Sequence, residues 1–454
     1  MARPRRSGGA RRVAYDVLRA TTERGAYANI LLPALLRERR LDGRDAALAT
    51  ELTYGTLRAR GTYDAILATC SDRPLAALDP PIVDALRLGV HQLLRTRIPA
   101  YAAVDATVGL VRTAVGPGPA RYANAVLRKV APRDLDGWLA IAAPAYDDDP
   151  IGHLAIVHSH PPWVVAALRD ALGGDRDEIE ALLAADNVPP SVTLLAKPGL
   201  ATADELAAAG ARQGWYSPYA AHLTEGDPAA VTAVREGRAA VQDEGSQLVT
   251  LALADLPVDG AEHSWLDLCA GPGGKASLLA GLARPRGVRL LAAERRPHRA
   301  RLVRDAVAGA AGTAHAVVAD AGMPAWPAGR FDRVLLDAPC TGLGALRRRP
   351  ELRWRRSPDD LIELTSLQRV LLENAIDAAR PGGLVAYVTC SPHLAETREI
   401  VDAVSRSRRD VVPVDPRPAL PALPGLGAGP YVQLWPHRHG TDAMFLAVLR
   451  RTVL

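Results

Sequence analysis

The sequence predicts an all-α N-terminal region, then a small α/β region, then a doubly wound, Rossmann-like α/β domain. Residues 10–130 carry apolar side chains at spacings of three and four, which is typical of amphipathic helices. From about residue 240, short apolar runs alternate with helical stretches, which is typical of a parallel sheet covered on both faces. A turn-rich, acidic stretch at 143–150 precedes a mixed pattern between these two regions. The expected domains are 1–142, 150–235 and 236–454.

Each helix expected in the first region rests on the same apolar spacing. The segment from Pro80 opens with two prolines, which are favoured at the start of a helix. No strand pattern interrupts this region, so we expect it to be entirely helical. The expected helices are 11–23, 28–40, 45–70, 80–96, 103–115 and 121–131.

The two later regions combine strands and helices. The mixed region has helical patterns at 161–173, 176–187 and 202–211 and one apolar, strand-like run at 191–197. In the third region, the apolar runs that predict strands are 264–270, 289–294, 315–320, 332–340, 384–390 and 442–451.

The composition excludes several classes of protein. Of 454 residues, 48% are hydrophobic, enough for the cores of two or three domains. No apolar run approaches the roughly 20 residues of a membrane helix, and the basic N-terminal stretch lacks the apolar segment of a secretory signal. The four cysteines form no C-x-x-C pair and have no histidine cluster nearby, which indicates neither a zinc site nor a disulfide framework. We expect a cytoplasmic, monomeric protein with no metal and no membrane partner.

A glycine loop at 269–275 lies between an expected strand and an expected helix. Gly271, Gly273 and Ala276 fit the G-x-G-x-x-G/A pattern, in which glycine permits a tight turn and close approach of a ligand. Alone this pattern is weak, because many strand-to-helix turns contain two glycines for steric reasons. The loop residues proposed to hold a cofactor are Cys269, Ala270, Gly271, Pro272, Gly273, Gly274 and Lys275.

Acidic residues follow three further expected strands and strengthen the cofactor hypothesis. Glu294, Asp320 and Asp337 each end a strand, at the edge where open α/β sheets bind ligands. One such acid is as often a helix cap, but three at corresponding positions favour a ligand site. A pyrophosphate is poorly matched to acidic groups, whereas the sulfonium and ammonium of S-adenosylmethionine suit them. The sequence therefore favours S-adenosyl-L-methionine over NAD.

Two cysteines, Cys340 and Cys390, follow expected parallel strands at the same edge as the glycine loop. A lone cysteine there is usually a small buried hydrophobe, which is our interpretation of Cys70 and Cys269. Two thiols beside a methyl donor suggest methylation of a pyrimidine. A thiolate that adds to carbon 6 of cytosine makes carbon 5 nucleophilic, and Asp337 is a candidate to engage nitrogen 3 of the base.

Arginine is concentrated in one segment, RRRPELRWRR at 347–356. The net charge of +5 is modest for this length, so this local density is the more informative feature. Phosphate contacts from Arg347 and Arg348 and base stacking on Trp354 are a common way to hold single-stranded RNA. The alternative is a solvated basic loop.

Five motifs in order resemble those of the Sun-type (NOL/NOP/Sun) RNA cytosine-5 methyltransferases. The N-terminal region also resembles the NusB family of helical RNA-binding domains, so the resemblance covers nearly the whole chain. The motifs are CAGPGGK (269–275), DAPCTGLG (337–344), RRRPELRW (347–354), VTCS (388–391) and GTDAMFLA (440–447).

The resemblance implies a role for each thiol. Cys390 would attack carbon 6 of the cytosine, and Cys340 would assist release of the methylated RNA. It also implies S-adenosylmethionine as cofactor and an antiparallel last strand at 442–451. The implied substrate is small-subunit (16S) ribosomal RNA, naked or within a partly assembled subunit, with another RNA such as tRNA as an alternative.

Other interpretations remain open at this point. A DNA cytosine-5 methyltransferase uses the Pro-Cys thiol as nucleophile, but the Glu-Asn-Val motif of that class is absent. A non-catalytic RNA-binding assembly factor would not require the intact loop, acids and thiols. Three departures from the family pattern are Gly271 in place of alanine, Thr397 after Glu396, and Ala443-Met444 in the last motif. None of them removes a catalytic group.

Overall fold

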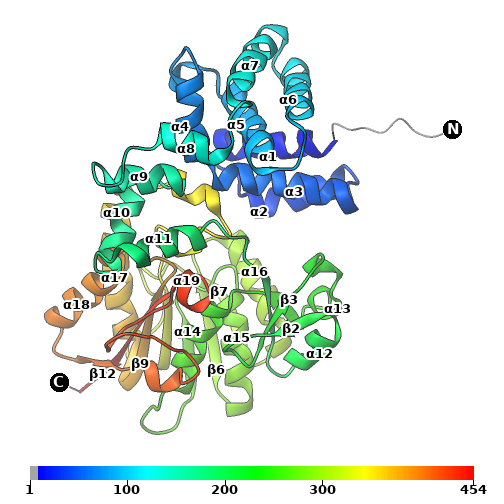
Figure 1. Cartoon of the computed structure of the whole chain (residues 1–454). Coiled ribbons are helices and arrows are strands. Elements are labelled where there is room, and N and C mark those ends of the chain that lie inside the picture. The colour runs from blue at the N-terminus through cyan, green and yellow to red at the C-terminus, as the bar shows by residue number, and fades with distance from the viewer. Residues whose placement is uncertain (1–8, 454) are drawn as a thin grey trace. The chain divides into compact units, whose positions relative to one another are not determined.

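The computed structural model describes residues 9–453 and divides the chain into two compact units (Figure 1). The helical unit comprises Met1–Val188 together with Leu346–Arg356. The sheet unit comprises Pro189–Ala345 together with Ser357–Leu454. This division cuts the region expected at 150–235, so the three-domain boundaries stay a prediction. The basic stretch at residues 1–8 lies outside the described residues.

The helical unit contains only helices and turns within residues 9–188, as the apolar spacing predicts. Its core is formed by side chains at helical spacing, such as Val13 and Val17 of α1 and Leu86 and Val90 of α5. The helices are α1 Gly9–Arg24, α2 Ala28–Glu38, α3 Gly43–Arg58, α4 Arg60–Cys70, α5 Pro80–Arg95, α6 Ala100–Ala114, α7 Pro117–Val130, α8 Leu135–Ala142, α9 Pro150–Val157, α10 Pro162–Ala171 and α11 Arg176–Ala185.

The sheet unit begins with a small antiparallel sheet in the order β2-β3-β1-β4. The run at 191–197 is its strand β1, and the helix expected from residue 202 is α12. The remaining strands are only three or four residues long and were not expected. The elements are β1 Val192–Ala196, α12 Ala203–Ala208, β2 Ala211–Gln213, β3 Ala220–Leu223, α13 Thr232–Arg235 and β4 Ala239–Val241.

The large sheet has the order β10-β12-β9-β8-β5-β6-β7, and β11 pairs with β12. Strands β7, β6, β5, β8 and β9 are parallel, whereas β12 runs antiparallel to β9, as expected for a last strand. The strands are β5 Ser264–Asp267, β6 Arg289–Glu294, β7 Ala314–Val318, β8 Phe331–Asp337, β9 Ala379–Thr389, β10 Val411–Val414, β11 Val432–Gln433 and β12 Phe445–Arg451.

Helices cover both faces of the large sheet, which gives the expected Rossmann-like layering. Successive strand residues face opposite layers, so Leu335 of β8 joins one core and Val334 and Leu336 join the other. Helices α14 Glu244–Asp255, α15 Gly274–Ala283 and α16 Pro297–Val307 pack in the first core. Helices α17 Pro358–Ala378 and α18 Arg398–Ser407 pack in the second. The short helix α19 Pro436–His439 precedes β12.

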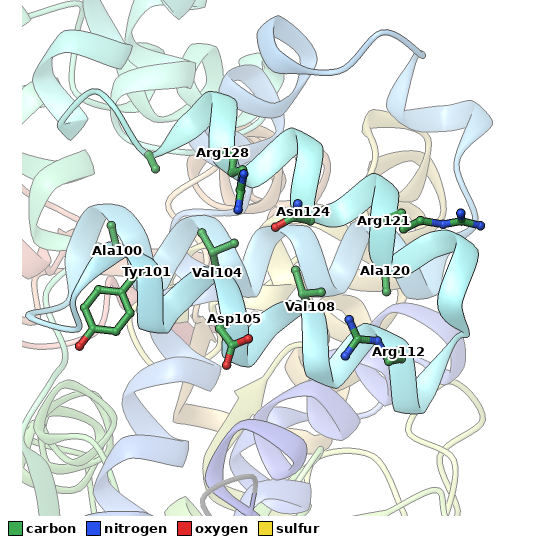
Figure 2. Close-up of a pocket in the computed structure, with 11 residues that line it drawn as sticks. Ala100, Tyr101, Val104, Asp105, Val108, Arg112, Ala120, Arg121, Asn124 and Arg128 are labelled. Carbon is green, nitrogen blue, oxygen red and sulfur yellow. The ribbon is translucent and has the colours of Figure 1, made fainter.

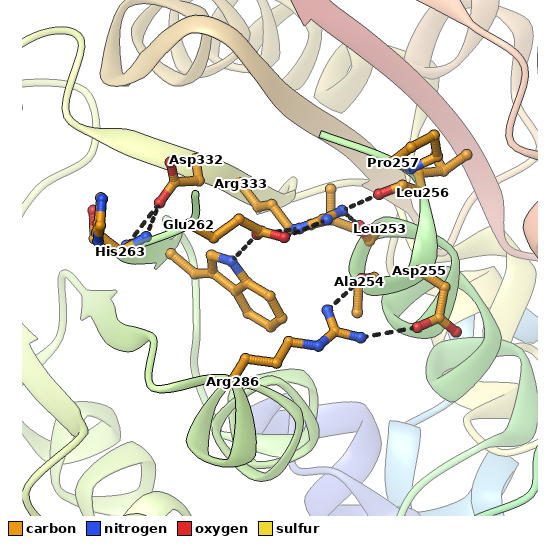
Figure 3. Close-up of polar contacts among 12 residues, drawn as sticks. Leu253, Ala254, Asp255, Leu256, Pro257, Glu262, His263, Arg286, Asp332 and Arg333 are labelled. Carbon is orange, nitrogen blue, oxygen red and sulfur yellow. Dashed lines mark hydrogen bonds and ion pairs between the residues drawn. The ribbon is translucent and has the colours of Figure 1, made fainter. Parts of the chain in front are cut away.

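A network of ion pairs joins the amino ends of the parallel strands (Figure 3). Arg333 at the start of β8 is 3% exposed and binds Glu262 through two hydrogen bonds of 2.6 and 2.8 Å. It also donates to the backbone carbonyls of Leu253 and Leu256 at the end of α14. Neighbouring Asp332 accepts from Arg380 at 2.6 Å and from the amide of Ser264 at 2.8 Å. This edge is thereby tied to α14 and to β9.

Among residues 9–453, no helix is long and apolar enough to cross a membrane.

Candidate functional site

The carboxyl edge of the large sheet gathers the residues expected to form the site. The glycine loop follows β5, Glu294 ends β6 and Asp337 ends β8. Cys390 follows β9 directly, and Asp320 lies two residues beyond β7. Because β5 lies between β6 and β8, the loop occupies the position where the strand order reverses, which is where such sheets bind ligands.

The glycine loop requires Gly273 for two reasons. Its backbone is left-handed, with φ +112°, at the residue before α15. A Cβ at this position would lie 2.5 Å from the Cβ of Ala306 in α16, which is too close. Gly271 leaves room in the same way, because a Cβ there would overlap the carboxylate of Glu294. The loop therefore approaches both α16 and the end of β6 with no side chain between.

Asp267 is the site residue that sequence reasoning missed. It ends β5 two residues before the glycine loop, is fully buried, and neither carboxylate oxygen bonds to another side chain within residues 9–453. Burial, together with the nearby Asp337, raises its pKa to about 8. A buried carboxylate without a side-chain partner is matched by a cationic ligand group. The same strand-end rule that selects Glu294 and Asp337 applies to Asp267.

The other acids of this edge have partners. Glu294 accepts from the amide of Arg296 at 2.8 Å and lies 3.6 Å from the guanidinium of Arg299. Asp320 accepts from the amide of Gly322 at 2.9 Å and is partly exposed. Their roles in binding a cofactor stay predictions.

Lys275 and Asp337 form an ion pair of 2.8 Å between Nζ and Oδ2. Burial opposes the charge on Lys275, but the contact with Asp337 outweighs it and raises the lysine pKa. The ammonium also interacts electrostatically with Cys390. A fixed positive charge near this thiol favours its ionised form.

Cys340 and Cys390 lie together, with their Sγ atoms 3.5 Å apart. The hydrogen bond to Cys390, together with burial, holds the pKa of Cys340 well above its usual range. Either thiol can donate in this contact, and the raised pKa means that Cys340 is harder to ionise than an ordinary thiol. Burial also raises the pKa of Cys269 far above normal, as expected for a packing residue. The pair that the sequence places at one edge is thus in direct contact.

A buried carboxylate, Glu396, links the segments that carry the two thiols. It accepts from the amide and the hydroxyl of Thr341, the residue after Cys340. It also accepts from Gln368, 3.1 Å away, and Gln368 in turn donates to the carbonyl of Pro339. The hydroxyl of Thr341 lies 3.1 Å from that of Ser391, next to Cys390. Glu396 thereby fixes the Cys340 loop from both sides.

The arginine-rich segment is part of the helical unit and is more buried than a solvated loop. Pro350–Trp354 forms a short 3-10 helix, in which Arg353 is fully buried and donates to the carbonyl of Ser159 at 2.9 Å and to Asn187 at 2.9 Å. Trp354 packs against Gly61, with the guanidinium of Arg60 5.2 Å from its ring.

Trp354 is half-buried, because one edge of its indole packs against Gly61 of α4, a tertiary contact that arginine density cannot reveal. Arg347 is also buried, at 7% exposure, and Arg348 is partly exposed. Contacts of these three residues with RNA stay predictions.

A basic groove of about 500 Å³ lies between α6 and α7 (Figure 2). Arg112, Arg121 and Arg128 line it, and none of them has an ion pair or hydrogen bond within residues 9–453. Tyr101 at one end is 80% exposed, and Asp105 is the only acid in the lining. Arg87 of the same unit, by contrast, is paired with Asp64 at 2.6 Å. Unpaired arginines along a groove suit a polyanion.

Within residues 9–453, no group of histidine, cysteine and acidic side chains is arranged to hold a metal ion.

Comparisons with known proteins match both parts of the chain. The model of the family described as 16S rRNA methyltransferase RsmB/F matches residues 254–450, and that of the NusB family matches residues 9–132. A putative methyltransferase of Mycobacterium tuberculosis is 54% identical over 445 residues, which cover 97% of this chain and 96% of that protein.

Two further similarities extend over most of the chain. The ribosomal RNA small subunit methyltransferase B of Pseudomonas putida is 32% identical over 87% of this chain and 88% of that protein. The crystal structure of PH0851 superposes with a TM-score of 0.80 at 22% identity, covering 99% of this chain and 100% of that one. At this identity the second similarity shows the fold alone.

Proposed function

Because the chain belongs to the RsmB/F family of 16S rRNA methyltransferases, we propose that it transfers a methyl group from S-adenosylmethionine to carbon 5 of a cytosine in RNA. The observation that carries this proposal is the pair of thiols 3.5 Å apart at the carboxyl edge, beside Lys275 and Asp337. Two adjacent thiols suit a reaction in which one attacks and the other acts later.

The cofactor-side residues fit a cationic ligand. Asp267 is buried without a side-chain partner and would pair with the ammonium of S-adenosylmethionine, and Glu294 would accept from its ribose hydroxyls. Gly271 and Gly273 keep the loop clear of side chains. When bound, this cofactor supplies an electrophilic methyl group.

The first covalent step belongs to Cys390. The ammonium of Lys275 and the neighbouring thiol of Cys340 would stabilise its thiolate. Addition of this sulfur to carbon 6 of the cytosine forms an S–C bond and moves electron density toward carbon 5 and nitrogen 3. Asp337 has a second oxygen, Oδ1, with which to engage nitrogen 3 while Oδ2 holds Lys275.

The later step involves Cys340. After carbon 5 has accepted the methyl group, its proton passes to a water molecule, the electrons of that C–H bond restore the double bond between carbons 5 and 6, and the S–C bond breaks with its electrons returning to the sulfur of Cys390. Cys340 is 3.5 Å from that sulfur and is held by the Glu396 network, so it is placed to assist this release.

RNA is the proposed polymer, with small-subunit ribosomal RNA as the proposed target. The relative in Pseudomonas putida is named for that RNA. The unpaired arginines of the α6–α7 groove and the exposed Tyr101 support binding of a single strand by the helical unit.

Two cysteine variants test the proposal with labelled ribosomal RNA on denaturing gels. Cys390→Ala is expected to transfer no methyl group and to form no covalent complex. Cys340→Ala is expected to attack and methylate, and then to accumulate a protein–RNA complex that survives denaturant. Cys70→Ala, a buried thiol of the helical unit, serves as the control and should behave as wild type.

Other outcomes have distinct meanings. A complex from Cys390→Ala and none from Cys340→Ala would reverse the two roles. Full activity in both variants would mean that the thiols only pack. Bisulfite sequencing of RNA from a deletion strain identifies the modified nucleotide, and a site in tRNA would correct the target.

A further inference from the structure

Trp215 is an exposed aromatic residue held in a defined position on the sheet unit. It lies in the loop between β2 and β3, and 59% of its surface is exposed. Single exposed apolar residues are normal on protein surfaces, so exposure alone indicates nothing. Trp215 differs from other exposed apolar residues in two ways, namely the contacts that fix its side chain and its location in the sheet unit.

The loop of Trp215 is anchored by the buried carboxylate of Glu244 at the start of α14. Glu244 accepts from the amides of Trp215, at 3.3 Å, and Tyr216, at 2.6 Å. It also accepts from the ring of His222, at 3.0 Å. Burial opposes ionisation of Glu244, but these hydrogen bonds outweigh it and lower its pKa. The centre of the His222 ring lies 4.5 Å from that of the Trp215 ring, so the indole packs against a side chain that is itself held by Glu244.

The other neighbour of the indole is Gly440, the first residue of the GTDAMF motif. A Cβ at Gly440 would overlap the indole, and its φ of +68° also favours glycine. Three residues later, the amide of Ala443 donates to Gly344 at 2.9 Å. The amide of Gly344 in turn donates to the carbonyl of Cys390 at 2.8 Å.

These contacts place the indole near the reacting thiol. Three residues of chain span at most about 10 Å, so Gly440 lies within roughly that distance of the backbone that contacts Cys390. With the contacts at both ends of this path, the indole lies at most roughly 20 Å from the backbone of Cys390, a distance that a few nucleotides of single-stranded RNA span.

We propose that Trp215 is a stacking surface for a base within a few nucleotides of the target cytosine in single-stranded RNA. The inference rests on the function proposed above. A rigid, exposed indole offers a π-face that any base can use, and single-stranded RNA is commonly held by bases stacked on aromatic side chains. Holding that base apart from the target base would help to present the cytosine to Cys390.

The test measures RNA affinity directly, by fluorescence anisotropy, so that it does not depend on turnover. The probe is a single-stranded oligonucleotide that carries the mapped cytosine. Trp215→Ala is expected to weaken binding about tenfold, the usual loss for one stacked base, whereas Trp215→Phe should retain most of the affinity and Trp215→Leu should not. The salt dependence should be unchanged, because no phosphate contact is removed.

Abasic oligonucleotides locate the contact. Removing the base that stacks on Trp215 should weaken binding by wild type about tenfold. It should not weaken binding by Trp215→Ala further, because the variant and the abasic probe remove the same interaction. Unchanged cofactor affinity in the variants serves as the control for folding.

Three results would overturn the proposal. They are wild-type affinity in Trp215→Ala, equal affinity in the Phe and Leu variants, and a loss of affinity in Trp215→Ala that adds to the loss from an abasic probe whichever base near the cytosine is missing. The function proposed above fails separately, if wild type makes no 5-methylcytosine or if Cys340→Ala traps no adduct.

Discussion

At the amino edge of the large sheet, Glu262 and Asp332 each have a buried or half-buried arginine partner, whereas at the carboxyl edge Asp267 has none within residues 9–453. At the first edge, burial opposes ionisation, but hydrogen bonds from Arg333 and from Ser264 and Arg380 outweigh it and lower the pKa of both acids. At the second edge, burial raises the pKa of Asp267 to about 8.

The two edges of the sheet thus differ in role: the amino edge stabilises the fold, and the carboxyl edge is suited to binding a ligand. Strand starts with satisfied ion pairs contribute stability, because breaking one of them would leave a buried charge. Strand ends with an unsatisfied acid and a raised thiol pKa reduce stability and are typical of a site that awaits a ligand. Changes at the amino edge should therefore alter folding, and changes at the carboxyl edge should alter binding and chemistry.

The largest effect is expected from Arg333→Met at the amino edge. It leaves the half-buried Glu262 with only its hydrogen bond from Trp265 and should lower the free energy of unfolding by about 2–3 kcal/mol, while cofactor affinity of the folded fraction is unchanged. Urea unfolding and calorimetry measure the two quantities. Exposed Arg330→Met is the matched control. Equal stability of the two variants would contradict the comparison.

Asp267→Asn should have the opposite profile. Removing the charge that pairs with a cationic ligand is expected to weaken S-adenosylmethionine binding about 10- to 100-fold, while urea stability stays the same or rises. Exposed Asp305→Asn is the control. Unchanged affinity in a folded Asp267→Asn protein would remove Asp267 from the cofactor site.

The two edges should also respond oppositely to pH. The folded pKa of Asp267, about 8, exceeds its unfolded value, so its contribution to stability is lost as pH rises toward and through 8. Glu262 and Asp332 have lowered folded pKa values, so their contribution is lost on acidification below their unfolded values. Wild type should lose more stability between pH 6 and 9 than Asp267→Asn does, and parallel curves would refute this.

How far the sequence predicts this site depends on whether the relevant contacts are local. Glu294, Asp337 and both thiols follow from strand patterns, because the carboxyl ends of parallel strands share one edge. Glu396 could not be found in this way, since its partners Thr341 and Gln368 lie far along the chain.

The fold was predicted with the same limit. Long periodic helices and apolar strands were recognised, whereas β2 and β4, of three residues each, carry too little pattern. The burial of Arg353 depends on its fit among carbonyls of the helical unit, which no local signal encodes.

Glu396→Gln should have a smaller effect, confined to the carboxyl edge. The carboxylate of Glu396 accepts two hydrogen bonds from Thr341, one from its backbone N–H and one from its hydroxyl, whereas the glutamine side chain offers only one acceptor oxygen. The Cys340 loop should therefore shift, and the rate of turnover should fall about tenfold. RNA and cofactor affinity should not change, and a partial build-up of the covalent complex should appear on denaturing gels. Exposed Glu399→Gln is the control, and a variant that loses cofactor binding instead would assign Glu396 to general folding.

The smallest effect per residue is expected in the helical unit. Replacing Arg112, Arg121 and Arg128 with Ser should weaken RNA binding several-fold and lower the slope of log affinity against log salt by about 2. The control variant replaces three exposed arginines at the amino edge of the large sheet with Ser, so that it also loses three positive charges. These residues are Arg289, Arg330 and Arg409. An equal change in slope for both triple variants would indicate a general charge effect.

The return of the chain to the helical unit at Leu346–Arg356 has a consequence for synthesis on the ribosome. The carbonyl of Ser159 and the side chain of Asn187 receive their hydrogen bonds from Arg353, which is made long after them. At about 5–20 residues per second, the N-terminal helices wait roughly 10 to 30 s for this residue. Until then the groups that Arg353 will bury are open to water or to a chaperone, and the helical unit is completed only after most of the catalytic edge has been translated.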